Sequence, residues 1–322
     1  ETSCQAFSTG QSYSYPRDFG GLENAFGIWR CPTAKKRVLV SNGITDHDVK
    51  QGNPNSMCAV PWYIEFPLNP TVTATRTEPA SHGVIAFGLN GIPAFGAQEA
   101  AGDNAYEHAE DAFIKDAKYW YGHASPDYTW HYHTPHMGAE AIANASTLVG
   151  YALDGFGLFG PVANQSELDT CNGRIDPSSG EYRYHMRTAE QVQAGPTHGG
   201  ENGYCDGTSP AINWNYVIGC YKGTLTETKS GDCSTMSLPG EDCVLEASNN
   251  LDKVWKDGKC LVKVVKVVKW WVWLIVGVVV VVVVVAGAIV CWRRRGKMSP
   301  GKGKAPPLAV RGGGGGEEES AA

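Results

Sequence analysis

The feature that most constrains this chain is the uncharged apolar stretch at 270–292, WWVWLIVGVVVVVVVVAGAIVCW. As a helix, its 23 residues would measure about 35 Å, enough to cross the ~30 Å hydrocarbon core of a bilayer. Tryptophans stand at both ends, where aromatic side chains prefer the membrane interfaces, and three arginines follow directly. In lipid, even a valine-rich segment is helical, because each backbone N–H and C=O must find its partner within the segment. The sequence therefore predicts one transmembrane helix.

Cysteine decides the expected orientation of this helix, since lysines and arginines flank it almost equally on both sides. Nine of the ten cysteines precede the helix, and so many thiols in a polar segment are typical of an oxidising compartment. The glycosylation acceptors Asn144-Ala-Ser and Asn164-Gln-Ser lie on the same side. We therefore expect a type I protein of the plasma membrane or another secretory-pathway membrane, with its N-terminus extracellular or lumenal. The first residue is Glu1, so we also expect that a signal peptide has been removed.

The composition divides the chain into four expected parts. Residues 1–222 form the ectodomain, 223–269 a cysteine-containing juxtamembrane stalk, 270–292 the transmembrane helix, and 293–322 a disordered cytoplasmic tail rich in Gly, Pro, Lys and Glu. The net charge of −6, without a basic patch among aromatics in the ectodomain, excludes a nucleic-acid-binding protein. An odd number of cysteines before the helix leaves one for another partner, and a disulfide-linked dimer is one possibility.

The ectodomain is expected to be mainly β, because abundant Gly, Pro, Trp and Tyr indicate short strands joined by tight turns. The expected strands are 37–40, 62–66, 71–77, 83–87, 128–133, 182–186 and 216–221. One helix is expected near 104–121, where apolar residues recur at helical spacing.

Two stretches of the ectodomain resemble each other. LNGIPAFG at 89–96 precedes WHYH at 130–133, and LDGFGLFG at 153–160 precedes YRYH at 182–185. Asn-Gly and Asp-Gly at matching places are hairpin-turn signals. The pattern predicts an imperfect duplication in which each unit has a turn, an apolar strand, a long connecting segment and an aromatic strand with histidine.

The order of several motifs resembles the YHYH-domain family. These are SNGITDH at 41–47, NPN at 53–55, LNGIP at 89–93, WHYH at 130–133 with Pro135, GYALDGF at 150–156, LDTCNGR at 168–174, GEYRY at 180–184 and GCYKG at 219–223. Trp130 replaces the leading tyrosine of the signature, and Arg183 stands where the second copy would have a histidine. The resemblance implies a shared fold and a shared histidine cluster, often in secreted or surface proteins. It implies no reaction.

The histidines of the signature are the candidate metal ligands. On a strand, His131 and His133 project from one face, and two such imidazoles suit zinc or copper. His136 is a possible third ligand, and His185 could approach if the two units pack side by side. His47 and His123 are candidates of second rank. The alternative is a structural ladder in which Tyr and His bond to backbone carbonyls and carboxylates, without a metal.

Three functions follow from these alternatives: a surface module that binds a transition metal, a metal-dependent hydrolase or oxidase, and an adhesion or receptor ectodomain with architectural histidines. The sequence contains no serine-nucleophile elbow, no His-Glu-x-x-His helix and no nucleotide-binding loop, so no catalytic constellation is recognisable. Asp154 and Asp169 are the candidate acid and base, although both are also explained as turn residues.

Overall fold

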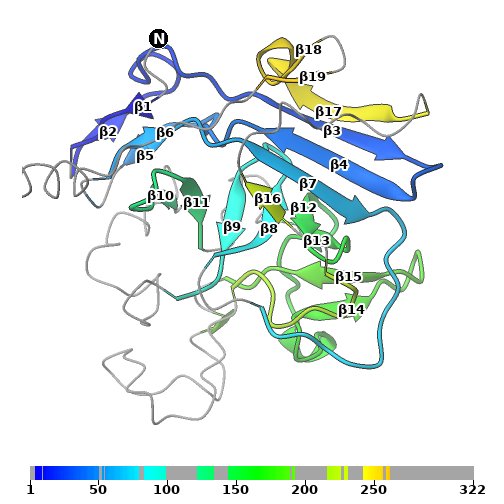
Figure 1. The fold of residues 1–322 in the computed structure, drawn as a ribbon. Coiled ribbons are helices and arrows are strands. Elements are labelled where there is room, and N and C mark those ends of the chain that lie inside the picture. The colour runs from blue at the N-terminus through cyan, green and yellow to red at the C-terminus, as the bar shows by residue number, and fades with distance from the viewer. Residues whose placement is uncertain are drawn as a thin grey trace, which may run out of the picture. The chain divides into compact units, whose positions relative to one another are not determined.

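The computed structural model describes residues 4–8, 10–50, 53, 55–79, 83–98, 122–133, 144–188, 191–192, 216–225, 228–230, 242–256 and 259–261. All of them belong to the compact unit Glu1–Val265, which is rich in β-structure (Figure 1). Within these residues, no helix has the length and apolar character needed to span a bilayer. The expected helices at 104–121 and 270–292 and the expected tail at 293–322 lie outside the described residues.

The first of two large sheets is antiparallel and has five strands in the order β16-β7-β4-β3-β17. Its strands are β3 (Phe26–Cys31), β4 (Lys36–Ser41), β7 (Trp62–Pro67), β16 (Thr228–Ser230) and β17 (Val244–Asn249). Alternate residues of the strands point to opposite faces. Ile28, Leu39 and Ile64 therefore face the second sheet within the main core, whereas Trp29, Val38 and Tyr63 face the other way into a smaller core.

The segment expected as a stalk completes this five-stranded sheet. It supplies the edge strands β16 and β17, which lie far from their neighbours in the sequence but beside them in space (Figure 1). The disulfide Cys31–Cys243 fastens β17 to β3. The short 3-10 helix η5 (Leu251–Lys253) and the hairpin β18 (Trp255–Lys256) and β19 (Lys259–Cys260) follow, and Val254 is fully buried in the smaller core. The described part of this segment thus packs on the domain, because its few apolar side chains cover the outer face of the sheet.

The second large sheet has eight short strands in the order β10-β11-β9-β8-β12-β13-β15-β14. The strands of the first unit are β8 (Val84–Gly88), β9 (Pro93–Phe95), β10 (Gly122–Ala124) and β11 (Trp130–Tyr132). Those of the second unit are β12 (Leu148–Ala152), β13 (Gly157–Phe159), β14 (Gly173–Ile175) and β15 (Tyr182–His185). Each unit is a hairpin, then a strand parallel to the second arm, then an antiparallel strand at the edge.

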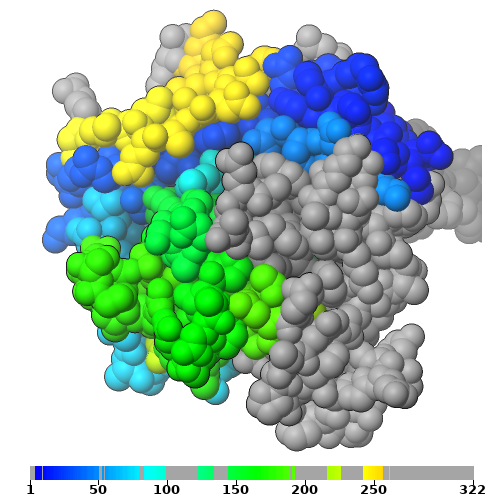
Figure 2. Space-filling model, turned by 180° about the vertical axis from the view of Figure 1, so that it is seen from behind, coloured from blue at the N-terminus to red at the C-terminus, as the bar shows by residue number. Residues whose placement is uncertain are grey.

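The two units repeat each other about a pseudo-two-fold axis between the central strands β8 and β12. Gly88 pairs with Gly150 and Ala86 with Ala152, a reciprocal register about the pair Phe87 and Tyr151. The duplication in the sequence therefore appears as a repeated topology, with the two histidine-bearing strands toward opposite edges of one sheet. Figure 2 shows the second unit in green from behind, below the blue and yellow strands of the five-stranded sheet.

The two turns of the duplicated motif explain why the repeat is visible in the sequence. Gly91 and Gly155 have φ angles of 79° and 90°, in the left-handed region that glycine tolerates best. Each closes a three-residue hairpin loop, with hydrogen bonds from Gly88 to Ile92 in the first unit and from Ala152 to Phe156 in the second.

Five of the seven expected strands are confirmed as β4, β7, β8, β11 and β15. The strands expected at 71–77 and 216–221 are wrong: these segments are irregular and meet only in an isolated bridge between Thr77 and Tyr221. The small sheets pair β1 (Cys4–Gln5) with β6 (Met57–Cys58) and β2 (Ser12–Tyr13) with β5 (Val49–Lys50). A 3-10 helix, η4 (Gln165–Glu167), lies in the second unit.

Candidate metal centre

Three buried histidines meet at the edge of the eight-stranded sheet. His131 lies on β11, and His133 follows two residues later on the same face. His123 lies on the edge strand β10 directly opposite His131 in the antiparallel register. Because side chains directly opposite each other share a face, the strand pair brings all three imidazoles together.

The Nε2 atoms of the three rings form a small triangle. Nε2 of His123 lies 2.9 Å from Nε2 of His131 and 3.1 Å from Nε2 of His133, and the last two atoms are 2.9 Å apart. In a tetrahedral zinc site with bonds of about 2.0–2.1 Å, the nitrogens lie about 3.4 Å apart. An outward movement of a few tenths of an ångström by each ring would therefore fit one metal ion.

The other nitrogen of two of these rings fixes the tautomer. Nδ1 of His131 lies 3.1 Å from the carbonyl oxygen of Thr129, and Nδ1 of His133 lies 2.6 Å from that of Gly96. A carbonyl oxygen only accepts, so both Nδ1 atoms carry the proton and donate it. Both Nε2 atoms are then acceptors, and Nε2–H of His123 faces them, because Nδ2 of Asn53 donates to Nδ1 of His123 at 3.2 Å. Metal-ligating histidines are commonly oriented by such second hydrogen bonds.

Protonation of His131 is unfavourable in this buried cluster. Burial lowers the pKa of His131 well below its usual value, and the neighbouring His123 and His133 lower it further. The Phe95 ring stacks on His131 with centroids 4.0 Å apart, which adds an apolar wall. The His131 imidazole is therefore neutral at physiological pH, the form that ligates a metal.

The opposite face of β11 holds a separate polar network. The Tyr132 hydroxyl lies 2.9 Å from Nε2 of His47 and accepts a hydrogen bond from the Asn90 side chain at 3.1 Å. Asn90 also donates to Asp46. Burial lowers the pKa of His47 to about 4. His47 thus fixes the Tyr132 hydroxyl and lies outside the histidine triad.

The structure groups the predicted ligands differently from the sequence. His131 and His133 come together, but their described third partner is His123, which the sequence ranked second. His136 lies outside the described residues. His185 does not approach the triad, because the units join through β8 and β12 and leave β15 five strand spacings, about 24 Å, from β11. An expected strand at 122–124 antiparallel to 130–132 would have identified His123 from the sequence.

Comparison with known protein families identifies the part of the chain that carries the histidines. Residues 63–208 match the family model described as YHYH protein. This part of the chain is a YHYH domain. Searches of curated proteins and of solved structures gave no match. The match runs from β7 through both units of the eight-stranded sheet, and the signature residues at 130–133 lie near the middle of the matched sequence.

The second unit of the YHYH domain lacks two of the three histidines. The register pairs Arg174 with Arg183 across β14 and β15, where the first unit pairs His123 with His131. Only His185 remains, and its Nδ1 lies 2.8 Å from the Gly160 carbonyl, as that of His133 lies near Gly96. Nε of Arg183 donates to Nε2 of His185 at 3.2 Å. A guanidinium N–H thus occupies the lone pair of His185, whereas that of His133 points toward His123 and His131.

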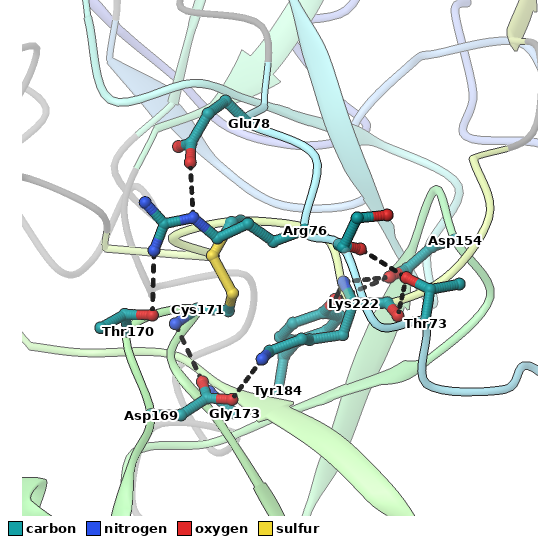
Figure 3. Close-up of a disulfide and its surroundings, with 12 residues drawn as sticks. Thr73, Arg76, Glu78, Asp154, Asp169, Thr170, Cys171, Gly173, Tyr184 and Lys222 are labelled. Carbon is teal, nitrogen blue, oxygen red and sulfur yellow. Dashed lines mark hydrogen bonds and ion pairs between the residues drawn. A yellow bond between two sulfur atoms is a disulfide. The ribbon is translucent and has the colours of Figure 1, made fainter.

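The two candidate acid–base carboxylates have structural roles beside the disulfide Cys171–Cys220 (Figure 3). Asp154 is fully buried and accepts hydrogen bonds from the Tyr184 hydroxyl at 2.6 Å and from the backbone N–H of Gly223 at 2.9 Å. Burial raises its pKa.

Asp169 orders the loop that carries the disulfide. It accepts from the backbone N–H of Cys171 at 2.8 Å and of Gly173 at 3.1 Å, and its carboxylate pairs with Lys222 at 3.6 Å. Figure 3 shows Lys222 between the two aspartates. Both carboxylates therefore join the segment around Cys220 to the second unit.

Proposed function

We propose that the YHYH domain binds one transition-metal ion through Nε2 of His123, His131 and His133. The observation that carries this proposal is the convergence of three Nε2 atoms, 2.9–3.1 Å from one another, inside a buried cluster. His131 and His133 offer acceptor nitrogens there, and a metal ion in place of the Nε2 proton of His123 would be bound by all three rings.

The donor set favours zinc or copper(II). The cluster offers three imidazoles, a ligand type that both ions accept, and the grouping of described residues includes no thiolate or carboxylate. Three protein ligands leave a fourth coordination position for water or another ligand. We favour binding, sensing or a structural role over hydrolysis or oxidation, because the candidate acid and base, Asp154 and Asp169, lie in the second unit and serve the fold there.

We also propose that the domain is displayed outside the cell by the apolar stretch at 270–292. Three disulfides, Cys4–Cys58, Cys31–Cys243 and Cys171–Cys220, support an oxidising compartment. Asn144 and Asn164 are exposed in turns where each side chain accepts from the backbone N–H two residues later, a surface position suited to glycosylation. Retention of the chain in membranes after alkaline carbonate washing tests the anchor, and release into the supernatant would contradict it.

Elemental analysis tests the metal proposal. The full chain, purified without a metal-affinity step, should carry about one equivalent of zinc or copper. A His131→Ala/His133→Ala variant should carry none while its three disulfides still form. Folded wild-type protein that stays metal-free in the presence of either ion would refute the proposal and leave the architectural reading of the histidines.

A further inference from the structure

A cavity of about 530 Å³ lies between the second unit of the YHYH domain and the five-stranded sheet. Arg37 of β4 lines one side, and Tyr151 of β12, Phe159 of β13, and Tyr182 and Arg183 of β15 line the other. This volume is typical of sites for small molecules. The cavity lies on the opposite half of the sheet from the histidine triad, so a ligand there would be independent of the metal.

The Arg37 guanidinium is held in a fixed place at this cavity. Its Cζ lies 4.0 Å from the centroid of the Tyr151 ring, and its Nε donates to Glu246 at 2.9 Å. Stacking uses the face of the guanidinium and leaves its in-plane N–H groups available for hydrogen bonds.

Arg183 repeats this arrangement on the other wall. Its Cζ lies 4.5 Å from the centroid of the Phe159 ring, and the guanidinium pairs with Asp176 and donates to His185. Because Arg183 stands at the position of His131, the second unit has a fixed hydrogen-bond donor where the first has an imidazole.

The charges around the cavity favour a neutral, polar ligand over an anion. Arg37 shares Glu246 with the neighbouring Arg30, and Arg183 pairs with Asp176. With Glu181 counted, three arginines face three carboxylates, so the charges balance without a ligand. Glu181 adds an exposed acceptor to the lining. The cavity lining thus carries both hydrogen-bond donors and a hydrogen-bond acceptor. This combination suits the adjacent hydroxyl groups of a ligand, because each hydroxyl both donates and accepts.

The apolar part of the lining indicates the shape of the ligand. Tyr151 and Phe159 are half-buried, each with a guanidinium over one face of its ring, and the rim carries Val72 and Ile175, which are 50% and 57% exposed. A pyranose ring has C–H groups on its faces and hydroxyls around its edge, so it matches an apolar rim combined with fixed polar groups.

We propose that this cavity binds a pyranose sugar. Its hydroxyls bond to Arg37, Arg183 and Glu181, while a C–H face packs on the apolar rim of Val72 and Ile175. The proposal is separate from metal binding and stands on the lining of a different half of the sheet.

Titration of the full chain with methyl pyranosides tests the sugar site. The probes are the methyl glycosides of glucose, galactose, mannose and N-acetylglucosamine, followed by saturation-transfer NMR before and after treatment with a chelator. We expect at least one glycoside to bind, with the same affinity in both states. Glu181→Gln and Arg183→Met should each weaken binding by at least about tenfold, because each removes a charged hydrogen-bonding partner.

Glu78→Gln is the matched control, since Glu78 is exposed and pairs with Arg76 outside the cavity. Its affinity for the glycoside should equal that of the unchanged protein. Glu181 is an exposed side chain, so its substitution leaves the fold intact even if Arg183→Met does not. Absence of binding by every glycoside, equal binding by Glu181→Gln, or a preference for benzoate over the sugars would overturn the proposal.

Discussion

Substitution of His123 by alanine separates the metal centre seen in the structure from the one that the sequence alone favoured. The triad includes His123 and leaves out His185, which stands about 24 Å away. We therefore expect His123→Ala to abolish tight metal binding and His185→Ala to leave it unchanged. His185 is the matched control, because both imidazoles are buried and both lie on strands of the same sheet.

The size of the effect follows from the number of ligands. Changing a residue that only orients a ligand costs about 10–100-fold in metal affinity, so removing one of three ligands should cost more than about 100-fold. With metal at 100 times its dissociation constant, the bound ion stabilises the fold by about 2.7 kcal/mol. A 100-fold weaker site under the same conditions keeps about 0.4 kcal/mol, so the melting temperature should fall by about 5–9 °C from this loss alone.

Competition against a chromophoric chelator measures the affinity, and calorimetry with and without added zinc measures the stability. The zinc-dependent rise in melting temperature should disappear in His123→Ala. It should persist in His185→Ala, although that variant melts lower because it loses the hydrogen bond to Gly160. If His123→Ala kept its affinity while His185→Ala lost it, the cluster deduced from the strand register would be refuted.

Three further predictions follow from the same structure. The free energy of unfolding should fall by about 1.4 kcal/mol through His47 for each unit that the pH drops from 6.5 to about 4, because the unfolded chain takes up the proton first. Urea titrations at pH 7, 6 and 5 measure this fall, and an unchanged unfolding free energy would mean that the buried ring takes up the proton as readily as the unfolded chain does. The double variant Arg174→His/Arg183→His should bind a second metal equivalent, and a folded variant with one equivalent would contradict the equivalence of the two units. Asn144→Gln and Asn164→Gln should each remove one glycan's mass from the secretory-pathway protein, and an unchanged mass after enzymatic deglycosylation would show that neither site is used.

Local patterns predicted the strands of the duplicated motif well. Asn90-Gly91 and Asp154-Gly155 form hairpin turns because glycine there adopts a positive φ, and the apolar residues that follow form β9 and β13. The same logic failed at 71–77, where β-prone threonines lie in an irregular segment. Among the described residues, this segment pairs with a neighbour only through the bridge at Thr77, so its β propensity does not produce a strand.

The role of 223–269 was not readable from composition. A segment with few large apolar residues resembles a stalk when viewed alone. Val254, Leu251 and Trp255 nevertheless suffice to cover the outer face of the five-stranded sheet, and Cys243 bonds to Cys31 across 212 residues. A few apolar groups are enough when they all reach one face.

The sequence by itself determined that this chain is β-rich, that it contains a repeated strand-and-turn unit, and that His131 and His133 share one face, because all three depend on neighbouring residues and on the two-residue period of a strand. Only the tertiary structure decided which histidine joins them. The antiparallel register of β10 and β11 places His123 opposite His131, whereas the junction of β8 with β12 sends His185 toward the far edge. Strand order and register arise from contacts between distant segments, so no local pattern carries them.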